Sequence, residues 1–305
     1  MATNYPCANL PALAVILLAV TYSAAVDPVD LAALLQIRNS LTEIPSAARF
    51  FSTWNFSSAA ADPCTSFAGV TCSPTTGRVS TLSLGTGLSG SPGLAGTLSP
   101  AVARLSGLTQ LILFAGILPR RLPVALRYIS LSRNLLRGPI DCLDSLPELA
   151  YVDLSANEFS GPIPGSLFRA GVSSIFLQRN NLTGRVPQSP PWPCSTVDLS
   201  HNFLWGEVST ALTGAEAVFL NNNRLNGVIP GEYAESVMKG EMRTLYLQHN
   251  YLTGFPLDVG STLPDAAAVC AAYNCMAAPP LGLVACPASA GEQLSRPAYQ
   301  CSAFH

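Results

Sequence analysis

Residues 149–164 read Leu-Ala-Tyr-Val-Asp-Leu-Ser-Ala-Asn-Glu-Phe-Ser-Gly-Pro-Ile-Pro, and this pattern recurs along the chain. Two weaker copies at 79–84 and 108–113 place Gly87 and Gly116 where an asparagine is expected. Self-similarity at a fixed period of 20 to 50 residues is the signature of a repeat architecture. In six copies the asparagine recurs at steps of 23, 23, 22, 21 and 27 residues: Asn134, Asn157, Asn180, Asn202, Asn223 and Asn250.

The repeat has a direct physical interpretation. Each x-Leu-x-Leu-x segment alternates polar and apolar residues, which predicts a short strand with one buried face. Strands of successive repeats would stack as a parallel ladder, and their leucines would form a core that no single repeat can build. A buried asparagine at each turn can bond backbone groups that would otherwise be unsatisfied. The sequence therefore predicts an α/β solenoid with parallel strands on its concave face.

Two departures from the period matter. The step from Gly116 to Asn134 is only 18 residues, which indicates either one truncated repeat or the loss of several. The Gly-x-Ile-Pro piece after each asparagine is expected to turn the chain onto the convex side without a full helix.

Composition narrows the class of protein. Charged residues make up 11% of the 305 residues, apolar residues 49%, and the net charge is −2. So few charges exclude a charge-rich disordered chain, and the weak net charge argues against strong nucleic-acid binding. The apolar run at 10–20 is too short for a good membrane span and suits a secretory signal, with small residues at 23–25 for cleavage. An uncleaved anchor is the alternative; no later stretch predicts a transmembrane segment.

Cysteine usage fits an oxidising compartment. Of nine cysteines, Cys7 would leave with the signal, and Cys142 and Cys194 stand alone and are not expected to pair. The other six form two end clusters, which suit disulfide-bonded caps, whereas no C-x2-C spacing supports zinc. The four C-terminal cysteines allow three connectivities. The end clusters are Cys64 and Cys72, then Cys270, Cys275, Cys286 and Cys301; the glycosylation acceptors are Asn55 and Asn181.

The form Asn-x-Leu-Ser/Thr-Gly-x-Ile-Pro resembles the leucine-rich repeats of plant extracellular proteins, such as receptor-like kinases, receptor-like proteins and polygalacturonase inhibitors. Residues 30–41, Trp54 and the stretch 62–72 are similar to the plant N-terminal cap, which implies a Cys64–Cys72 bridge. The C-terminal cysteines resemble those of a kinase-less plant group that includes the Piriformospora indica-insensitive protein. The resemblance implies a right-handed superhelix divided into a signal peptide (1–25), an N-terminal cap (26–77), about eight repeats (78–257) and a C-terminal cap (258–305).

Candidate ligand-binding residues are the strand positions that face the concave side. Aromatic residues on one stripe of such a face are unusual and can mark an interaction surface, although the rings could also simply pack on each other. Aromatic side chains beside an arginine are typical binding anchors. The expected contact residues are Phe176, Gln178, Arg179, Asp198, His201, Phe219, Tyr246 and Gln248, with Arg133, Asn222 and His249 on the same outer stripe.

Three motifs suggest chemistry but do not support it. Gly85-Thr-Gly-Leu-Ser-Gly90 matches a dinucleotide-binding pattern, yet no acid follows before Asp141 and Pro92 breaks the helix. His201 and His249 lie two coils apart, roughly 10 Å, which is too far to share a metal. Asp198, Ser200 and His201 lack a nucleophile elbow. We therefore predict no catalytic residues, no metal and no cofactor.

The charge distribution leaves one further possibility. Seven arginines and no acids lie within 63–140, which suits either an acidic partner such as wall pectin or plain solvated positions. The leading hypothesis is a secreted, apoplastic protein that binds a peptide or a receptor ectodomain, with no nucleic-acid partner. The alternatives are an inhibitor of a wall-degrading enzyme such as polygalacturonase, and a shortened copy without a ligand.

Overall fold

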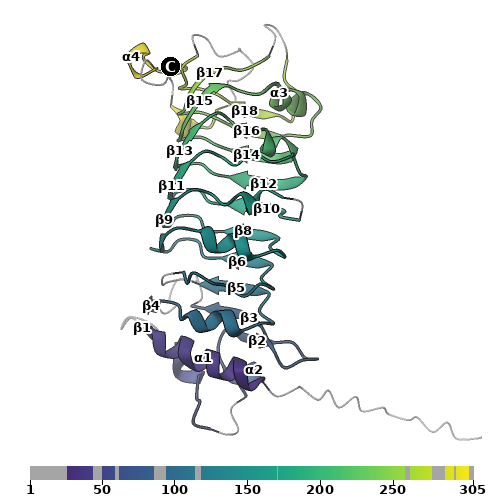
Figure 1. The fold of residues 1–305 in the computed structure, drawn as a ribbon. Helices are drawn as coiled ribbons and strands as arrows, with labels where there is room; N and C mark the ends of the chain where they lie inside the picture. The colour runs from purple at the N-terminus through teal and green to yellow at the C-terminus, as the bar shows by residue number, and fades with distance from the viewer. Residues whose placement is uncertain are drawn as a thin grey trace, which may run out of the picture.

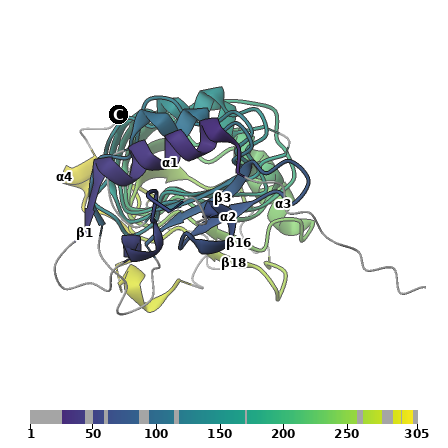
Figure 2. The ribbon, with the colours of Figure 1, turned by 90° about the horizontal axis from the view of Figure 1, so that it is seen from below.

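The computed structural model describes residues 26–43, 50–58, 62–85, 94–113, 118–169, 171–257, 262–276, 286–291 and 293–301. The expected signal peptide and the columns at Gly87 and Gly116 lie outside these residues. Successive turns of the chain stack in sequence order between an N-terminal cap and a C-terminal cap (Figure 1). The view along the stack shows that the strands of successive turns superpose (Figure 2).

The main sheet has ten strands, and from β3 onward all neighbours are parallel. The register keeps one core residue per turn in line, so Ile129 lies beside Val152 and Val152 beside Ile175. These side chains are fully buried, as the alternating pattern predicts. In sheet order the strands are β2 (Val70–Cys72), β3 (Val79–Leu84), β5 (Gln110–Leu113), β6 (Tyr128–Ser130), β8 (Tyr151–Asp153), β10 (Ser174–Phe176), β12 (Cys194–Asp198), β14 (Ala215–Phe219), β16 (Thr244–Tyr246) and β18 (Ala268–Cys270).

A second parallel sheet of six strands runs beside the first, and the sequence did not suggest it. It is formed by the Asn-x-Leu-Ser/Thr-Gly segments, which follow the strands of the main sheet. Buried and exposed side chains continue to alternate along each segment, which therefore forms one more short strand. The glycine that closes each of these segments except the last has a positive φ, for example 90° at Gly184, which explains its place in the repeat. The strands are β7 (Arg137–Gly138), β9 (Glu158–Gly161), β11 (Asn181–Gly184), β13 (Phe203–Gly206), β15 (Arg224–Val228) and β17 (Tyr251–Gly254).

Short 3-10 turns carry the chain back toward the main sheet in four of the described repeats. One repeat differs from the expectation of no full helix, because α3 (Gly231–Met238) is an α-helix. That repeat spans the longest asparagine step, 27 residues, so it has the extra chain that a helix needs. The 3-10 turns are η2 (Pro100–Arg104), η3 (Asp141–Ser145), η4 (Gly165–Leu167) and η5 (Thr210–Gly214).

The asparagine column links each turn to the next. Asn180 Nδ2 donates to the carbonyl oxygens of Leu154 at 2.9 Å and Leu177 at 3.1 Å, while its Oδ1 accepts the N–H of Phe159 at 3.0 Å. A buried amide therefore satisfies backbone groups in two successive turns. The same contacts continue at Asn274, which is fully buried and lies inside the expected C-terminal cap. The repeated structure thus extends past residue 257.

The N-terminal cap begins with α1 (Pro28–Ser40), whose buried face supplies Ala33, Leu34 and Ile37. An aromatic cluster fills the space beneath the first turn, where the Trp54 ring stacks on Phe67 at 5.2 Å. A disulfide joins Cys64 to Cys72. The remaining elements are β1 (Leu41–Glu43), paired antiparallel with β4 (Leu94–Gly96), η1 (Phe50–Thr53) and α2 (Pro63–Ser66).

The C-terminal cap is held by two disulfides. Of the three connectivities left open, the structure contains Cys270–Cys286 and Cys275–Cys301. The first bridge ties the segment with η6 (Ala288–Ala290) to the final strand of the main sheet, and the second ties α4 (Ala298–Cys301) to the turn that follows this strand.

The repeat with the short 18-residue step still places its strand next to the preceding one in the main sheet. Gln110 pairs with Tyr128 and Ile112 with Ser130, so an 18-residue step still advances the sheet by one strand in register. The main sheet is therefore continuous through the truncated repeat.

Cys142 and Cys194 are unpaired and buried. Burial raises the pKa of the Cys142 thiol to about 12 and that of Cys194 to about 11, so both stay protonated near neutral pH.

We expect iodoacetamide at pH 8 to label neither thiol in the folded protein and both after denaturation without reductant, as measured by peptide mass spectrometry. Rapid labelling of the folded protein would contradict the burial of these side chains.

Candidate binding face

The outer face of the main sheet carries the residues that the sequence predicts for ligand contact. Its central stripe is half-buried throughout and consists of Ser130, Asp153, Phe176, Asp198, Phe219 and Tyr246. The strands that carry them are hydrogen-bonded neighbours, so their side chains form one continuous row.

Aromatic rings dominate this face in two groups. Tyr128 and Tyr151 stack with ring centroids 4.4 Å apart and planes 6° from parallel, and Phe176 follows at 5.8 Å from Tyr151. We call these three residues the aromatic ladder. A second pair, Phe219 and Tyr246, lies edge to face at 5.3 Å. The rings pack on each other, as the simpler alternative supposes, and each still keeps part of its surface exposed.

Two members of the aromatic ladder were missed in the sequence. Tyr128 and Tyr151 stand immediately before the buried residue of their strands, whereas the stripe expected from the sequence consists of the residues immediately after that buried residue. Positions i and i+2 of a strand face the same side, so the tyrosines share the face of Phe176. The tyrosines at corresponding positions of successive repeats were the signal that could have identified them. Burial is the main reason that the pKa of Tyr151 rises to about 12, so its hydroxyl stays protonated.

Two aspartates on the face fold back on their own strands. Asp153 Oδ1 accepts bonds from the backbone N–H of Ser155 at 3.0 Å and from its hydroxyl at 2.6 Å. Asp198 Oδ1 accepts the N–H of Ser200 at 3.0 Å. Burial raises the pKa of Asp198, against the lowering effect of the Ser200 bonds. These carboxylates shape the surface between the rings.

The outermost stripe has an unusual backbone. Arg133, Arg179, His201, Asn222 and His249 all adopt φ values between 55° and 60°, the left-handed region that non-glycine residues rarely enter. This conformation turns the chain sharply just before each buried asparagine. Arg133, Arg179 and His201 are exposed, so cationic or neutral ring groups line one border of the face. Burial and then Arg179 lower the pKa of His201, which favours its neutral form.

The C-terminal cap covers one end of the face, and this removes Gln248 from the expected contact surface. Gln248 is only 2% exposed, and its Oε1 has no hydrogen-bond partner within the described residues. His249 Nε2 bonds the carbonyl oxygen of Ala290 at 3.0 Å, and the His249 ring packs on Tyr273. Ligand contacts therefore remain a prediction for Phe176, Gln178, Arg179, Asp198, His201, Phe219 and Tyr246.

The two histidines of the outermost stripe have different hydrogen-bond partners. His201 bonds Asn222, not Ser200, and His249 bonds the cap, so the two histidines do not converge. Across the described part of the chain no three His, Cys, Asp or Glu side chains are grouped to hold a metal ion.

The predicted glycosylation acceptors are both exposed. Asn55 follows η1, and Asn181 begins β11 on the second sheet. Their modification stays a prediction.

Comparison with known proteins agrees with this fold. Residues 27–73 match the family model of the leucine rich repeat N-terminal domain. No curated protein matches the sequence. Among solved structures, PEPR1 in complex with AtPEP1 is 25% identical over 81% of this chain, with a TM-score of 0.53. The ectodomain of Arabidopsis thaliana GASSHO1/SCHENGEN3 in complex with CASPARIAN STRIP INTEGRITY FACTOR 2 is 25% identical over 80%, with a TM-score of 0.55.

A plant ice-binding protein shows the same fold at 22% identity, covering 83% of this chain and 88% of its own, with a TM-score of 0.59. By contrast, this chain spans 32% of PEPR1 and 35% of GASSHO1/SCHENGEN3. The protein is therefore a leucine-rich-repeat solenoid, similar to ectodomains of plant receptors. Its three disulfides suit an oxidising, extracellular compartment. No helix in the described ranges is long and apolar enough to cross a membrane.

Proposed function

We propose that the protein is a binding module that recognises a peptide or a receptor ectodomain on the concave face. The aromatic ladder carries this proposal. Tyr128, Tyr151 and Phe176 present three half-buried rings in contiguous strands, with exposed Arg179 beside them. Clustered aromatic and arginine side chains on a rigid surface supply most of the energy in protein interfaces.

The structural neighbours support the same kind of ligand. PEPR1 is seen with AtPEP1, and GASSHO1/SCHENGEN3 with CASPARIAN STRIP INTEGRITY FACTOR 2. Both are 25% identical to this chain, which spans only 32% and 35% of their length. Their ligands therefore do not identify the ligand of this protein, which has to be inferred from its own surface. A free segment that docks across the strands would contact both the aromatic ladder and the Phe219–Tyr246 pair.

The setting we propose is the plant cell surface or apoplast, in signalling or defence. Three disulfides suit an oxidising compartment. The closely spaced C-terminal cysteines are the reason to place the chain in the kinase-less group that includes the Piriformospora indica-insensitive protein.

Proximity labelling of the secreted full chain at the cell surface tests this function. The concave variant Tyr151→Ser/Phe176→Ser is compared with a matched control, Phe203→Ser/Trp205→Ser, which removes two exposed aromatic residues from the second sheet. We expect receptor ectodomains enriched by the wild type and the control and lost with the concave variant. Equal labelling by all three proteins would contradict the proposal, and enrichment of pectin-degrading enzymes would favour the inhibitor alternative.

A further inference from the structure

Within the described residues, the second sheet has a gap at the short repeat, where no strand is assigned. Its described strands begin at β7, which pairs with β9 on one side only. The preceding turn contributes β5 to the main sheet but, within residues 118–127, adds no strand to the second sheet. The strand β4 of the turn before that pairs with β1 in a separate sheet. One edge of β7 is thus left without a neighbouring strand in the described chain.

Asn134 differs from the other asparagines of the column in its hydrogen bonds. In six turns the asparagine Oδ1 accepts a backbone N–H from the second-sheet segment of the preceding turn; Asn157 Oδ1, for example, accepts the N–H of Leu136 at 3.0 Å. At the gap, Asn134 is 8% exposed and its Nδ2 makes the usual bonds, yet its buried Oδ1 has no partner within the described residues. A buried acceptor without a donor is costly.

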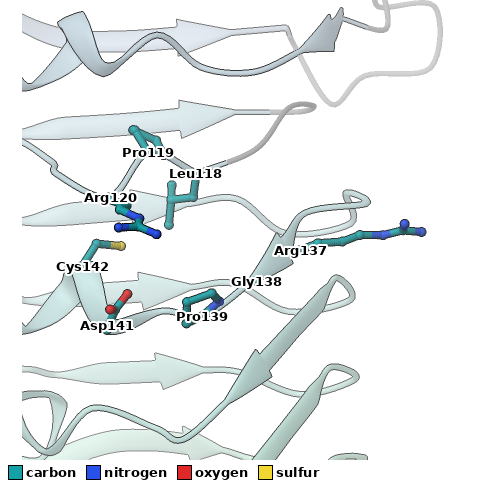
Figure 3. Close-up of a pocket in the computed structure, with 8 residues that line it drawn as sticks. All are labelled: Leu118, Pro119, Arg120, Arg137, Gly138, Pro139, Asp141 and Cys142. Carbon is teal, nitrogen blue, oxygen red and sulfur yellow. The ribbon is translucent and has the colours of Figure 1, made fainter.

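A cavity of about 530 Å³ lies between the short turn and the turn that carries β7. Leu118 and Pro119 line it from the short turn, and Gly138, Pro139 and Cys142 from the next (Figure 3). The figure shows Arg120 and Asp141 close to Cys142, while the Arg137 side chain extends away on the outer side. The region therefore combines a cavity with apolar and charged lining residues, a strand edge without a neighbour in the described chain and, three residues before Arg137, the unpaired acceptor of Asn134.

The charged residues around the cavity indicate which kind of ligand could occupy it. Arg137 on β7 forms an ion pair with Glu158 on β9 at 2.8 Å, so one side of this guanidinium already faces a carboxylate across the strands. Arg120 is exposed and lines the cavity together with Arg137, while Asp141 is the acid among its lining residues, so cations outnumber acids there. A carboxylate on a strand at the open edge of β7 would lie beside Arg137 as Glu158 does.

We propose that this gap is a second binding site, which takes an extended segment of a partner protein as an added strand. The segment pairs its main chain with β7, donates one N–H to Asn134 Oδ1, inserts an apolar side chain toward Leu118 and places a carboxylate beside Arg137. Strand addition to an open sheet edge is an established mode of peptide recognition. The site lies outside the concave face and does not depend on the function proposed there.

A synthetic peptide tests this site directly. The probe is the sequence of residues 157–164, acetylated, amidated and fluorescent, because this segment already forms the strand that pairs with the other edge of β7. By the register of the repeats, the N–H of its phenylalanine is the donor for Asn134 Oδ1. We expect saturable binding by fluorescence anisotropy, weakened about tenfold or more when that single amide is N-methylated.

Two protein variants complete the test. Leu118→Trp fills the cavity and should abolish binding, whereas the concave variant Tyr151→Ser/Phe176→Ser should bind the probe within about twofold of wild type. A probe with a photoreactive side chain in place of phenylalanine should crosslink within residues 118–142. Absence of binding, equal binding of the N-methylated probe, or crosslinks confined to the concave strands would overturn the proposal.

Discussion

Asn180→Ala should lower the free energy of unfolding by about 4 kcal/mol. The side chain is 5% exposed, donates to three carbonyl oxygens and accepts one N–H. Alanine leaves these buried groups unsatisfied and opens a cavity between two turns. Denaturant unfolding followed by circular dichroism measures the loss.

Asn134→Ala is the matched control. Asn134 makes the same kind of donor contacts, but its Oδ1 has no partner in the described chain, so alanine removes fewer bonds. We expect it to cost clearly less than Asn180→Ala. An equal or larger loss would show that the asparagine acceptor contributes little to the stack.

Arg78→Ala should destabilise the N-terminal cap by about 3 kcal/mol. The Arg78 guanidinium lies 2.7 Å from the carboxylate of Asp30, which is fully buried and also accepts the N–H of Val79. Removing the arginine leaves a buried charge without its cation. Hydrogen exchange of α1, read by mass spectrometry, measures the local loss.

The pH dependence of this variant has a defined sign. Burial raises the pKa of Asp30 above its ordinary value of 3.8, and losing Arg78 should raise it further. The folded cap then binds a proton more readily than the unfolded chain, so the variant should regain stability as pH falls from 7 toward 4. The double variant Arg78→Ala/Asp30→Asn should recover part of the loss at pH 7. A variant whose stability falls with pH over this window would contradict a buried, unpaired Asp30.

The repeat columns in the sequence were enough to predict the solenoid and its parallel concave strands, because a buried Leu and Asn period leaves few other packings. The second sheet was not predicted, since Arg137–Gly138 and its equivalents are too short to stand out as strands. The extension to Asn274 was missed because Ala268–Cys270 replaces the leucines of the repeat.

Side-chain contacts limited the prediction of the site. Phe176, Phe219 and Tyr246 were found from alternation along each strand, but the stacking of Tyr128 on Tyr151 depends on the register between strands. Gln248 was expected to contact ligand because its strand position faces the concave side. Its burial depends on where the disulfide-bonded segment 286–291 lies, and four cysteines with three connectivities do not specify that.

The central claim is that the concave face binds through its aromatic ladder, and affinity for one isolated partner tests it most directly. Using an ectodomain or peptide recovered by proximity labelling, calorimetry should show at least a tenfold weaker Kd for Tyr151→Ser/Phe176→Ser. The control Phe203→Ser/Trp205→Ser should match the wild type, with all three proteins equally folded by circular dichroism. Undiminished affinity of the concave variant, or a loss confined to the second-sheet control, would contradict the account.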